Sequence, residues 1–268
     1  MSNPKRGLDR EWDAAAYHRI SGPQVSWGEK VLSRLNLAGH ETVLDAGCGT
    51  GRLTGTLLDA LPKGRVIAVD LSENMLREAR GYLVSRHRSA SYFVAADLAT
   101  LPLKDCLDGI FSTASFHWIR DHALLFRSLF TALQAGGWLV AQCGGGPNLA
   151  RFRKTLHSLC QQAPYSSNLA TFEEPWFFSD AETAACNLRD AGFIEVETSV
   201  EPAPTAFADA QHFIEFVRTA IVHRHLSLIP DPVQKRSFLD ALARLSEADN
   251  PSFQLDYWRL NLRARKPA

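Results

Sequence analysis

The chain alternates between short apolar runs and longer segments whose apolar residues recur at helical spacing. The short runs are rich in β-branched residues and do not alternate with polar ones, which is typical of strands buried on both faces of a parallel sheet. The segments after them repeat apolar residues every three or four positions, which predicts helices with one buried face. This order predicts an α/β protein with a Rossmann-like, doubly wound sheet. The expected strands cover residues 42–44, 65–70, 91–96, 107–115 and 139–143.

The pattern becomes less regular after residue 143, where Gly-Gly-Gly-Pro interrupts it. Aromatic residues then mix with basic and polar ones over 148–178, and we expect an insertion there that covers the substrate. A helix over 179–191 and an alternating strand over 193–200 follow. The remaining expected elements are a helix over 207–229, a helix around 238–245 and a last strand over 254–263.

Composition narrows the choice of partners. The 29 Lys and Arg residues balance 29 Asp and Glu residues, and a formal net charge of zero does not favour nucleic acid or an anionic membrane. The five cysteines are scattered without Cys-x-x-Cys pairs, so we expect reduced thiols and neither a disulfide framework nor a metal site. No secretory signal or membrane-spanning apolar run is visible, and the expected location is cytoplasmic.

A glycine-rich turn follows the first strand and reads Asp45-Ala-Gly-Cys-Gly-Thr-Gly51. Glycines allow a ligand to approach the backbone closely, and the next helix would present free N–H groups. The dinucleotide fingerprint needs a glycine where the chain has Arg52, and no Gly-Lys-Ser/Thr follows for a phosphate cradle. The carboxylate of Asp45 would repel a pyrophosphate and attract an ammonium group.

The second expected strand also ends in an acid, Asp70. It lies 23 residues after Gly47, near the spacing at which an acidic residue accepts hydrogen bonds from ribose hydroxyls. The two acids and the glycines together predict a ligand with an amine at one end and a ribose at the other.

These motifs resemble the cofactor site of class I S-adenosylmethionine-dependent methyltransferases. The resemblance rests on the glycine turn and on Val69-Asp-Leu-Ser-Glu-Asn-Met75, and it extends over about residues 43–141. The run Phe116-His-Trp-Ile-Arg-Asp121 narrows it to the group that contains the trans-aconitate methyltransferases. The family's fold implies a seven-stranded sheet with a late antiparallel strand and helical insertions that form a lid.

The resemblance implies S-adenosylmethionine as the cofactor. It also implies four segments along the chain. These are a helical arm over the cofactor site (1–40), a cofactor-binding core (41–143), a lid insertion (144–178), and a C-terminal part of the sheet (179–268) that contains a helical insertion (207–250). An acid after the third strand would receive the adenine amino group. The expected cofactor-binding residues are Asp45, Gly47, Cys48, Gly49, Gly51, Asp70, Leu71, Met75, Asp97, Leu98, Ser115 and Gln24.

The acceptor side of the site is less well specified. The candidates for catalysis are His117 and Tyr17; His117 could act as a general base, as a donor to a carboxylate, or as a residue packed against the cofactor. Trp118 is expected to shape the pocket, and an arginine could bind a carboxylate. The candidate substrate-binding residues are Tyr17, His117, Trp118, Arg151, Arg218 and Arg224.

We therefore expect methyl transfer to a small-molecule acceptor. A carboxylate is the preferred acceptor because it is nucleophilic without a base, and the sequence shows no convincing acid–base pair. The alternatives are a hydroxyl, carbon or nitrogen of a natural product or quinone precursor and, in another class, a cofactor-binding regulator without turnover. Arg52 argues against a nicotinamide oxidoreductase. A monomer and a dimer both stay open.

Overall fold

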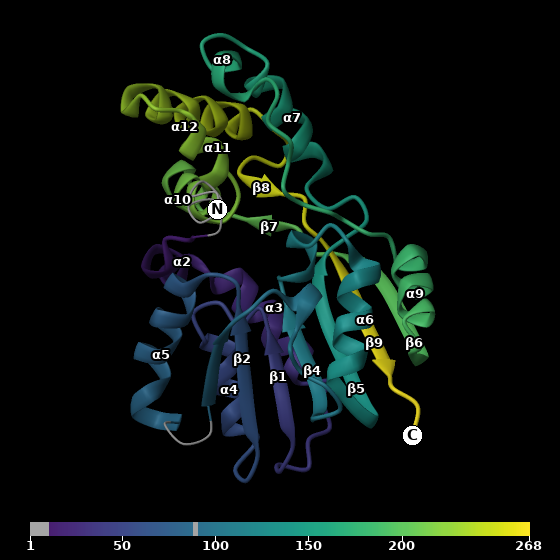
Figure 1. The fold of residues 1–268 in the computed structure, drawn as a ribbon. Helices are drawn as coiled ribbons and strands as arrows, with labels where there is room; N and C mark the ends of the chain where they lie inside the picture. The colour runs from purple at the N-terminus through teal and green to yellow at the C-terminus, as the bar shows by residue number, and fades with distance from the viewer. Residues whose placement is uncertain (1–10, 88–90) are drawn as a thin grey trace, which may run out of the picture. The chain divides into compact units, whose positions relative to one another are not determined.

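A computed structural model describes residues 11–87 and 91–268, which form two compact units (Figure 1). The first unit contains the chain up to Gly146 together with Trp176–Glu201 and Arg259–Ala268. The second contains Pro147–Pro175 and Pro202–Trp258. Among the described residues, no helix combines the length and the apolarity that a membrane crossing requires.

A seven-stranded sheet forms the centre of the first unit, in the order β3-β2-β1-β4-β5-β9-β6. The strands from β3 to β5 pair in parallel, whereas β9 pairs antiparallel with β5. The predicted sheet with a late antiparallel strand is therefore confirmed. The bounds are β1 Thr42–Ala46, β2 Arg65–Asp70, β3 Ser91–Ala95, β4 Leu107–Thr113, β5 Leu133–Gly144, β6 Ile194–Pro202 and β9 Trp258–Arg265.

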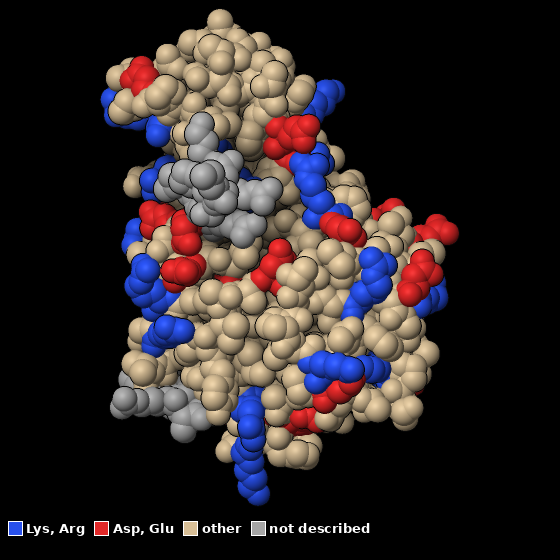
Figure 2. Space-filling view, in the orientation of Figure 1, with Lys and Arg blue, Asp and Glu red and all other residues tan. Residues whose placement is uncertain are grey.

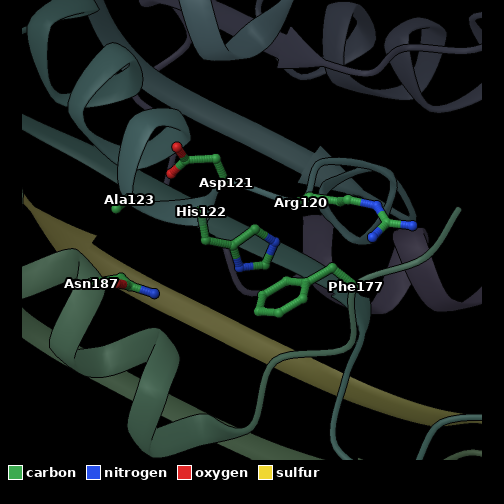
Figure 3. A pocket seen from close by; sticks show the side chains of 6 residues that line it. All are labelled: Arg120, Asp121, His122, Ala123, Phe177 and Asn187. Carbon is green, nitrogen blue, oxygen red and sulfur yellow. The ribbon is translucent and has the colours of Figure 1, made fainter.

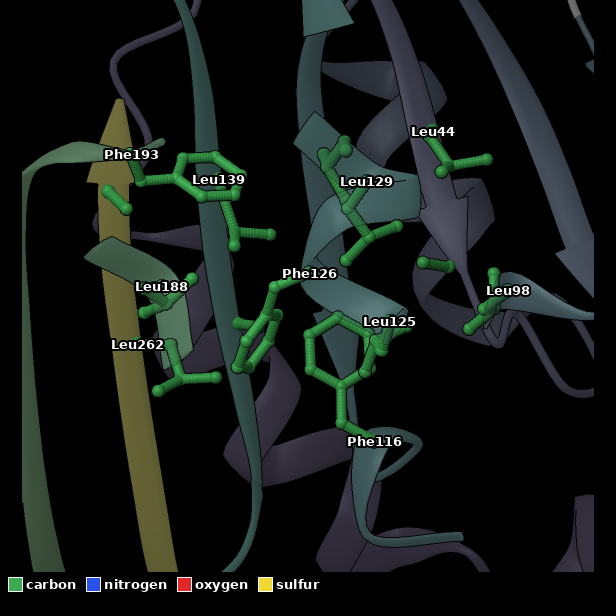
Figure 4. Packing of buried hydrophobic residues seen from close by; sticks show 14 of the residues in the cluster. Leu44, Leu98, Phe116, Leu125, Phe126, Leu129, Leu139, Leu188, Phe193 and Leu262 are labelled. Atoms are coloured by element: carbon green, nitrogen blue, oxygen red, sulfur yellow. The ribbon is translucent and has the colours of Figure 1, made fainter. Parts of the chain in front are cut away.

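Apolar side chains on both faces of this sheet explain why its strands do not alternate with polar residues. In β1, Leu44 belongs to a buried cluster that also contains side chains of α6 and α9, while its neighbour Val43 belongs to a second cluster with side chains of α3 and α4. Figure 4 shows the first of these layers, where Phe116 and Phe126 lie between the strands and α6. The helices of this unit are α2 Ala14–Ile20, α3 Gly22–Leu32, α4 Arg52–Asp59, α5 Glu73–His87, α6 His122–Ala132 and α9 Ala181–Asp190, with short 3-10 turns η1 Leu98–Thr100 and η2 Phe116–Trp118.

The second unit is mainly helical and has its own aromatic core. Phe152 packs against Phe213 with ring centroids 6.3 Å apart, and Tyr165 packs against Phe238 at 5.1 Å. A short antiparallel pair, β7 with β8, accompanies the helices. The bounds are α7 Ala150–Cys160, α8 Ser166–Leu169, α10 Ala210–Ala220, α11 His223–Leu228, α12 Pro232–Glu247, β7 Thr205–Ala206 and β8 Gln254–Leu255.

Two predicted elements are wrong because each is interrupted. The helix expected over 207–229 is split into α10 and α11, since Ile221 leaves the helical conformation at φ −120° and ψ −58°. The apolar pattern continues through the break, because Ile221 and Val222 are buried. The strand expected over 254–263 is split into β8 and β9, since the Asp256 carboxylate accepts the backbone N–H groups of Arg151 and Phe152 at the start of α7.

Candidate functional site

The loop between β1 and α4 adopts a backbone that requires glycine. Gly47, Gly49 and Gly51 have φ angles of +81°, +54° and +79°. A Cβ atom on Gly47 would lie 2.0 Å from the Ser115 hydroxyl oxygen, so the loop already packs tightly there. A Cβ on Gly49 would meet no atom within 4 Å. The loop is therefore open at Gly49, where a ligand can approach the backbone.

Two carboxylates border this opening. Asp45 is 3% exposed and accepts a 2.6 Å hydrogen bond from the Thr54 hydroxyl. Burial raises the pKa of Asp45 to about 7, and the charge of Asp70 adds to the shift, while the Thr54 bond opposes it. Asp70 accepts the N–H groups of Gly49 and Ser72, each at 2.9 Å, and burial raises its pKa as well. Two acids with raised pKa values favour a cationic ligand.

A cavity opens between the glycine loop and the N-terminal helices. The Oε1 atom of Gln24 is buried at this cavity and accepts no hydrogen bond from the described residues. An acceptor of this kind, in a cavity that Asp45 also lines, suits a ligand that carries N–H or O–H donors. The ammonium group and ribose hydroxyls of S-adenosylmethionine fit this requirement. The cavity is lined by Tyr17, Ser21, Gln24, Val25, Asp45, Gly47, Cys48, Gly49, Thr50, Arg52, Leu53, Thr113 and Ala114.

The N-terminal arm is attached to both motifs of the site. The Glu11 carboxylate accepts hydrogen bonds from the Ser72 hydroxyl at 2.9 Å and from the Asn74 N–H at 3.1 Å, at the start of α5. A carboxylate is favourable there because the helix N-terminus presents free N–H groups. Further along the arm, His18 Nδ1 lies 2.9 Å from the Thr50 hydroxyl of the glycine loop. These contacts hold the segment that carries Tyr17 and Gln24.

The hydrogen bonding of His117, in η2, defines which of its two ring nitrogens carries the proton. Its Nδ1 atom accepts the backbone N–H of Gly144 at 3.2 Å. Burial lowers the pKa of His117 well below 6.5, and the charge of Arg259 adds to the shift. The ring is therefore neutral near pH 7, and with Nδ1 as acceptor its proton lies on Nε2.

Tyr17 and His117 are connected by a series of aromatic contacts. Trp12 lies 5.5 Å from Tyr17 and 5.2 Å from Trp118, and Trp118 lies 5.4 Å from His117, measured between ring centroids. Burial and the charge of Asp70 raise the pKa of Tyr17 to about 12. The phenol stays protonated at neutral pH, so Tyr17 can donate a proton in a hydrogen bond but is a poor base.

Arg259 is a buried residue beside this arrangement that residue types and spacing did not single out. It is 3% exposed, and its guanidinium carbon lies 4.4 Å from the centre of the Trp27 ring. It stands opposite Gly144 in the β5–β9 register, beside the amide that binds His117. No sequence signal separates it from Arg263 and Arg265, which lie on the same strand with exposed side chains.

The other expected cofactor residues differ in their exposure and in the contacts that they make within the protein. Leu71 is 42% exposed next to Asp70, whereas Met75 is buried. Asp97 accepts the Ala99 N–H at 2.9 Å and so begins η1, and the side chain of Leu98 belongs to the core (Figure 4). Cys48 is buried, and burial raises its pKa well above 9.0. Their contacts with a cofactor stay predictions.

The three expected substrate arginines belong to the second unit. The Arg151 guanidinium donates to the carbonyl oxygens of Asn250 at 3.2 Å and Gln254 at 2.8 Å, and it lies 3.3 Å from the Asp249 carboxylate. Arg218 is exposed on α10, and Arg224 is half-buried on α11. The role of all three in acid recognition stays a prediction.

A second hollow lies at the start of α6 (Figure 3). His122 Nε2 donates to the Phe116 carbonyl at 3.1 Å, and its ring packs edge-on against Phe177. The Asp121 carboxylate accepts the Leu124 N–H at 2.8 Å and caps the helix. These are structural roles, and in Figure 3 the Asp121 side chain points away from the His122 ring.

Charges on the surface are mixed in sign. On the face drawn in Figure 2, Lys and Arg are interspersed with Asp and Glu among uncharged residues. The drawn face therefore offers no extended field of one sign for a polyanion.

Comparisons with known proteins agree with this geometry. Residues 43–137 match the family described as a methyltransferase domain. The trans-aconitate 2-methyltransferase of Methylobacterium radiotolerans is 29% identical over 254 residues, which cover 90% of this chain and 91% of that protein. An uncharacterized methyltransferase of Schizosaccharomyces pombe is 26% identical over 191 residues, covering 68% and 70%.

Solved structures share the fold. A Bacillus halodurans structure described as a putative methyltransferase superposes with a TM-score of 0.63 at 18% identity, covering 91% of this chain and all of that one. A Haemonchus contortus phosphoethanolamine N-methyltransferase 2 in complex with S-adenosyl-L-methionine has a TM-score of 0.61 at 18% identity, covering 95% and 57%.

Proposed function

Given that this chain is a class I S-adenosylmethionine-dependent methyltransferase, we propose that it methylates a carboxylate oxygen of a small molecule. When bound, S-adenosylmethionine supplies a methyl group on a sulfonium: the carboxylate oxygen forms the new C–O bond as the C–S bond breaks, the electron pair stays on sulfur, and a neutral ester and S-adenosylhomocysteine result. No proton leaves the acceptor in this reaction.

The residues around the cavity would hold the cofactor at both ends. Asp45 and the Gln24 amide oxygen would accept from its ammonium group, and Asp70 would accept from the ribose hydroxyls. Asp70 is already oriented by two backbone N–H groups, so the lone pairs that remain are fixed in direction. The open backbone at Gly49 would lie against the ligand.

The observation that carries the proposal is that His117 and Tyr17, the two candidate bases among the described residues, are both poorly suited to act as a base at neutral pH. Nδ1 of His117 is occupied by the Gly144 N–H, and burial lowers the pKa of this ring well below 6.5. The pKa of Tyr17 is about 12. A hydroxyl or protonated amine must lose a proton on methylation, whereas a carboxylate needs no base.

The M. radiotolerans relative supports the same acceptor chemistry. It aligns along nine-tenths of both chains and is named for methylating trans-aconitate, a carboxylic acid. Its 29% identity supports the class of acceptor rather than the particular acid. Carboxylate O-methylation is therefore the proposed activity, without trans-aconitate as the proposed substrate.

The test is the release of S-adenosylhomocysteine by purified protein with matched panels of carboxylic acids, phenols, alcohols and amines. We expect turnover with acids alone and a product that alkali hydrolyses back to the acid with loss of methanol. Turnover with phenols or amines, rising with pH as a base deprotonates, would contradict the proposal and favour the hydroxyl or nitrogen alternative. Cofactor binding with no turnover on any panel would favour a regulator.

A further inference from the structure

A buried cation lies on the acceptor side of the site. Arg259 is 3% exposed, and a buried guanidinium is stable only where anions, hydrogen-bond acceptors or aromatic faces compensate for its lost hydration. Trp27 supplies one aromatic face at 4.4 Å. Arg259 stands opposite Gly144 in the β5–β9 register, and the Gly144 amide binds His117; the charge of Arg259 also acts on the pKa values of Tyr17 and His117.

His117 contributes a hydrogen-bond donor near the same position. The Gly144 amide that occupies its Nδ1 atom belongs to the residue opposite Arg259 in the β5–β9 register. The remaining ring nitrogen, Nε2, carries a proton and can donate it in a hydrogen bond. A guanidinium and a neighbouring N–H donor form an arrangement that matches one carboxylate group.

Five partly exposed aromatic side chains continue from this position; we call them the aromatic cluster. Trp118 lies 6.0 Å from Trp176, and Trp176 stacks on Phe178 with centroids 6.1 Å apart and an interplanar angle of 13°. Phe178 lies 5.9 Å from His117, which closes the cluster back onto the donor. Its members are Trp12, Tyr17, Trp118, Trp176 and Phe178.

We infer that the acceptor is a monocarboxylic acid with a flat apolar body, bound by its carboxylate to Arg259 and His117 Nε2 and by its body to the aromatic cluster. The inference rests on the proposed function, which it deepens by naming the class of acid. Flat apolar bodies pack well against aromatic rings. The second and third carboxylates of a tricarboxylate would lose hydration against these aromatic rings, which carry no positive charge to compensate, and that loss is costly.

Arg52 is not available as a second cation for the acceptor, because its guanidinium is engaged at the cofactor cavity. Its guanidinium donates to the His18 carbonyl at 3.3 Å and lies 3.4 Å from the Ser21 hydroxyl, at the cofactor cavity. It therefore serves the arm and the glycine loop, where the cationic end of the cofactor is expected. Among the described residues, Arg259 is the buried arginine; it stands opposite the Gly144 amide that binds His117, and its guanidinium packs on the Trp27 ring.

The first test measures binding and turnover with three probes of defined charge and shape. Calorimetry in the presence of S-adenosylhomocysteine should give binding of trans-cinnamate, and about 30- to 100-fold weaker binding of cinnamamide, which lacks the charge. Turnover should give a larger kcat/KM for trans-cinnamate than for trans-aconitate. A preference for trans-aconitate would overturn the inferred class of acid and leave carboxylate methylation standing. Failure of every acid to bind or react would overturn both.

The second test replaces Arg259 and uses Arg263 as the matched control on the same strand. In Arg259→Gln, KM for trans-cinnamate should rise about 30- to 100-fold, with kcat and S-adenosylhomocysteine affinity changed less than about threefold. Arg263→Gln should leave all three values within about twofold, since its Glu197 pair is exposed. An unchanged KM in Arg259→Gln would overturn the role of Arg259.

A conservative variant covers the case in which removing a buried charge prevents folding. Arg259→Lys keeps the charge but loses the planar pair of donors, and it should raise KM about tenfold while the protein still binds S-adenosylhomocysteine. Wild-type KM in this variant would show that a point charge is sufficient and would overturn the paired-donor geometry. Loss of cofactor binding in both variants would assign Arg259 to the fold and overturn its role in acceptor binding.

Discussion

Replacing Asp45 with asparagine should stabilise the cofactor-free protein above neutral pH while it weakens cofactor binding. Asparagine has nearly the same shape, and its amide oxygen can still accept the 2.6 Å hydrogen bond from Thr54. The change removes only the ability to carry a charge at a position that is 3% exposed. The effect on stability therefore reports the free energy of keeping this carboxylate ionised in the folded state.

The size and sign of the effect follow from the pKa of Asp45. Burial raises it from 3.8 to about 7, so the folded state binds a proton more tightly than the unfolded state does. The resulting destabilisation is absent below pH 3.8, grows up to pH 7 and is constant above it. Three pKa units correspond to about 4 kcal/mol above pH 7, and to about 2 kcal/mol at pH 5.5.

Urea unfolding of the cofactor-free protein at pH 5.5 and pH 8 measures these values. Asp45→Asn should gain about 2 kcal/mol at the lower pH and about 4 kcal/mol at the higher one. Asp190→Asn, the same change at an exposed acid at the end of α9, should shift stability by less than about 0.5 kcal/mol at both. Binding of S-adenosylhomocysteine should weaken about 10- to 100-fold in Asp45→Asn, because its ammonium group loses a charged partner. A gain that is equal at both pH values, or a loss at pH 8, would refute the reasoning.

Three further predictions concern the same site. Affinity of the wild type for S-adenosylhomocysteine should fall about tenfold per pH unit below pH 7, as Asp45 becomes protonated, and calorimetry should find this slope absent in Asp45→Asn. Gly49→Ala should lower the free energy of unfolding by only about 1 kcal/mol, since its Cβ meets no protein atom within 4 Å, yet it should abolish measurable cofactor binding. Gly47→Ala, the comparison variant, should unfold at a lower urea concentration because its Cβ clashes with the Ser115 side chain. With saturating cofactor, kcat/KM for an acid acceptor should be flat from pH 6 to 8, because burial keeps His117 neutral; an inflection near pH 6.5 would show that His117 titrates during the reaction.

The sequence predicted the parts of the molecule whose roles are decided locally. The glycine turn, the acid that ends β1 and the acid that ends β2 follow directly from residue types and short spacings. The Ser72 hydroxyl accepts the Met75 N–H at 3.2 Å at the start of α5, which is the short-range capping that a serine at this position favours. Such features need no knowledge of the rest of the chain.

The sequence could not predict features that depend on distant pairing. Arg259 is buried because β9 lies against β5, and its pattern in the sequence is the same as that of the exposed Arg263. The tautomer of His117 depends on the Gly144 amide, which another strand positions. The break at Ile221 lies in an apolar segment that keeps helical spacing, so periodicity gives no sign of it.

The position of β9 at the end of the chain also affects the order in which the parts of the site can assemble during translation. Synthesis proceeds from the N-terminus, so β1 to β5, the glycine loop and the arm are available before β9 leaves the ribosome. Between β5 and β9 the chain must produce β6 and the whole helical unit. The cofactor cavity can thus form during translation, whereas Arg259 arrives with the last strand. A nascent chain stalled before this strand would contain the cofactor-binding motifs without their neighbouring arginine.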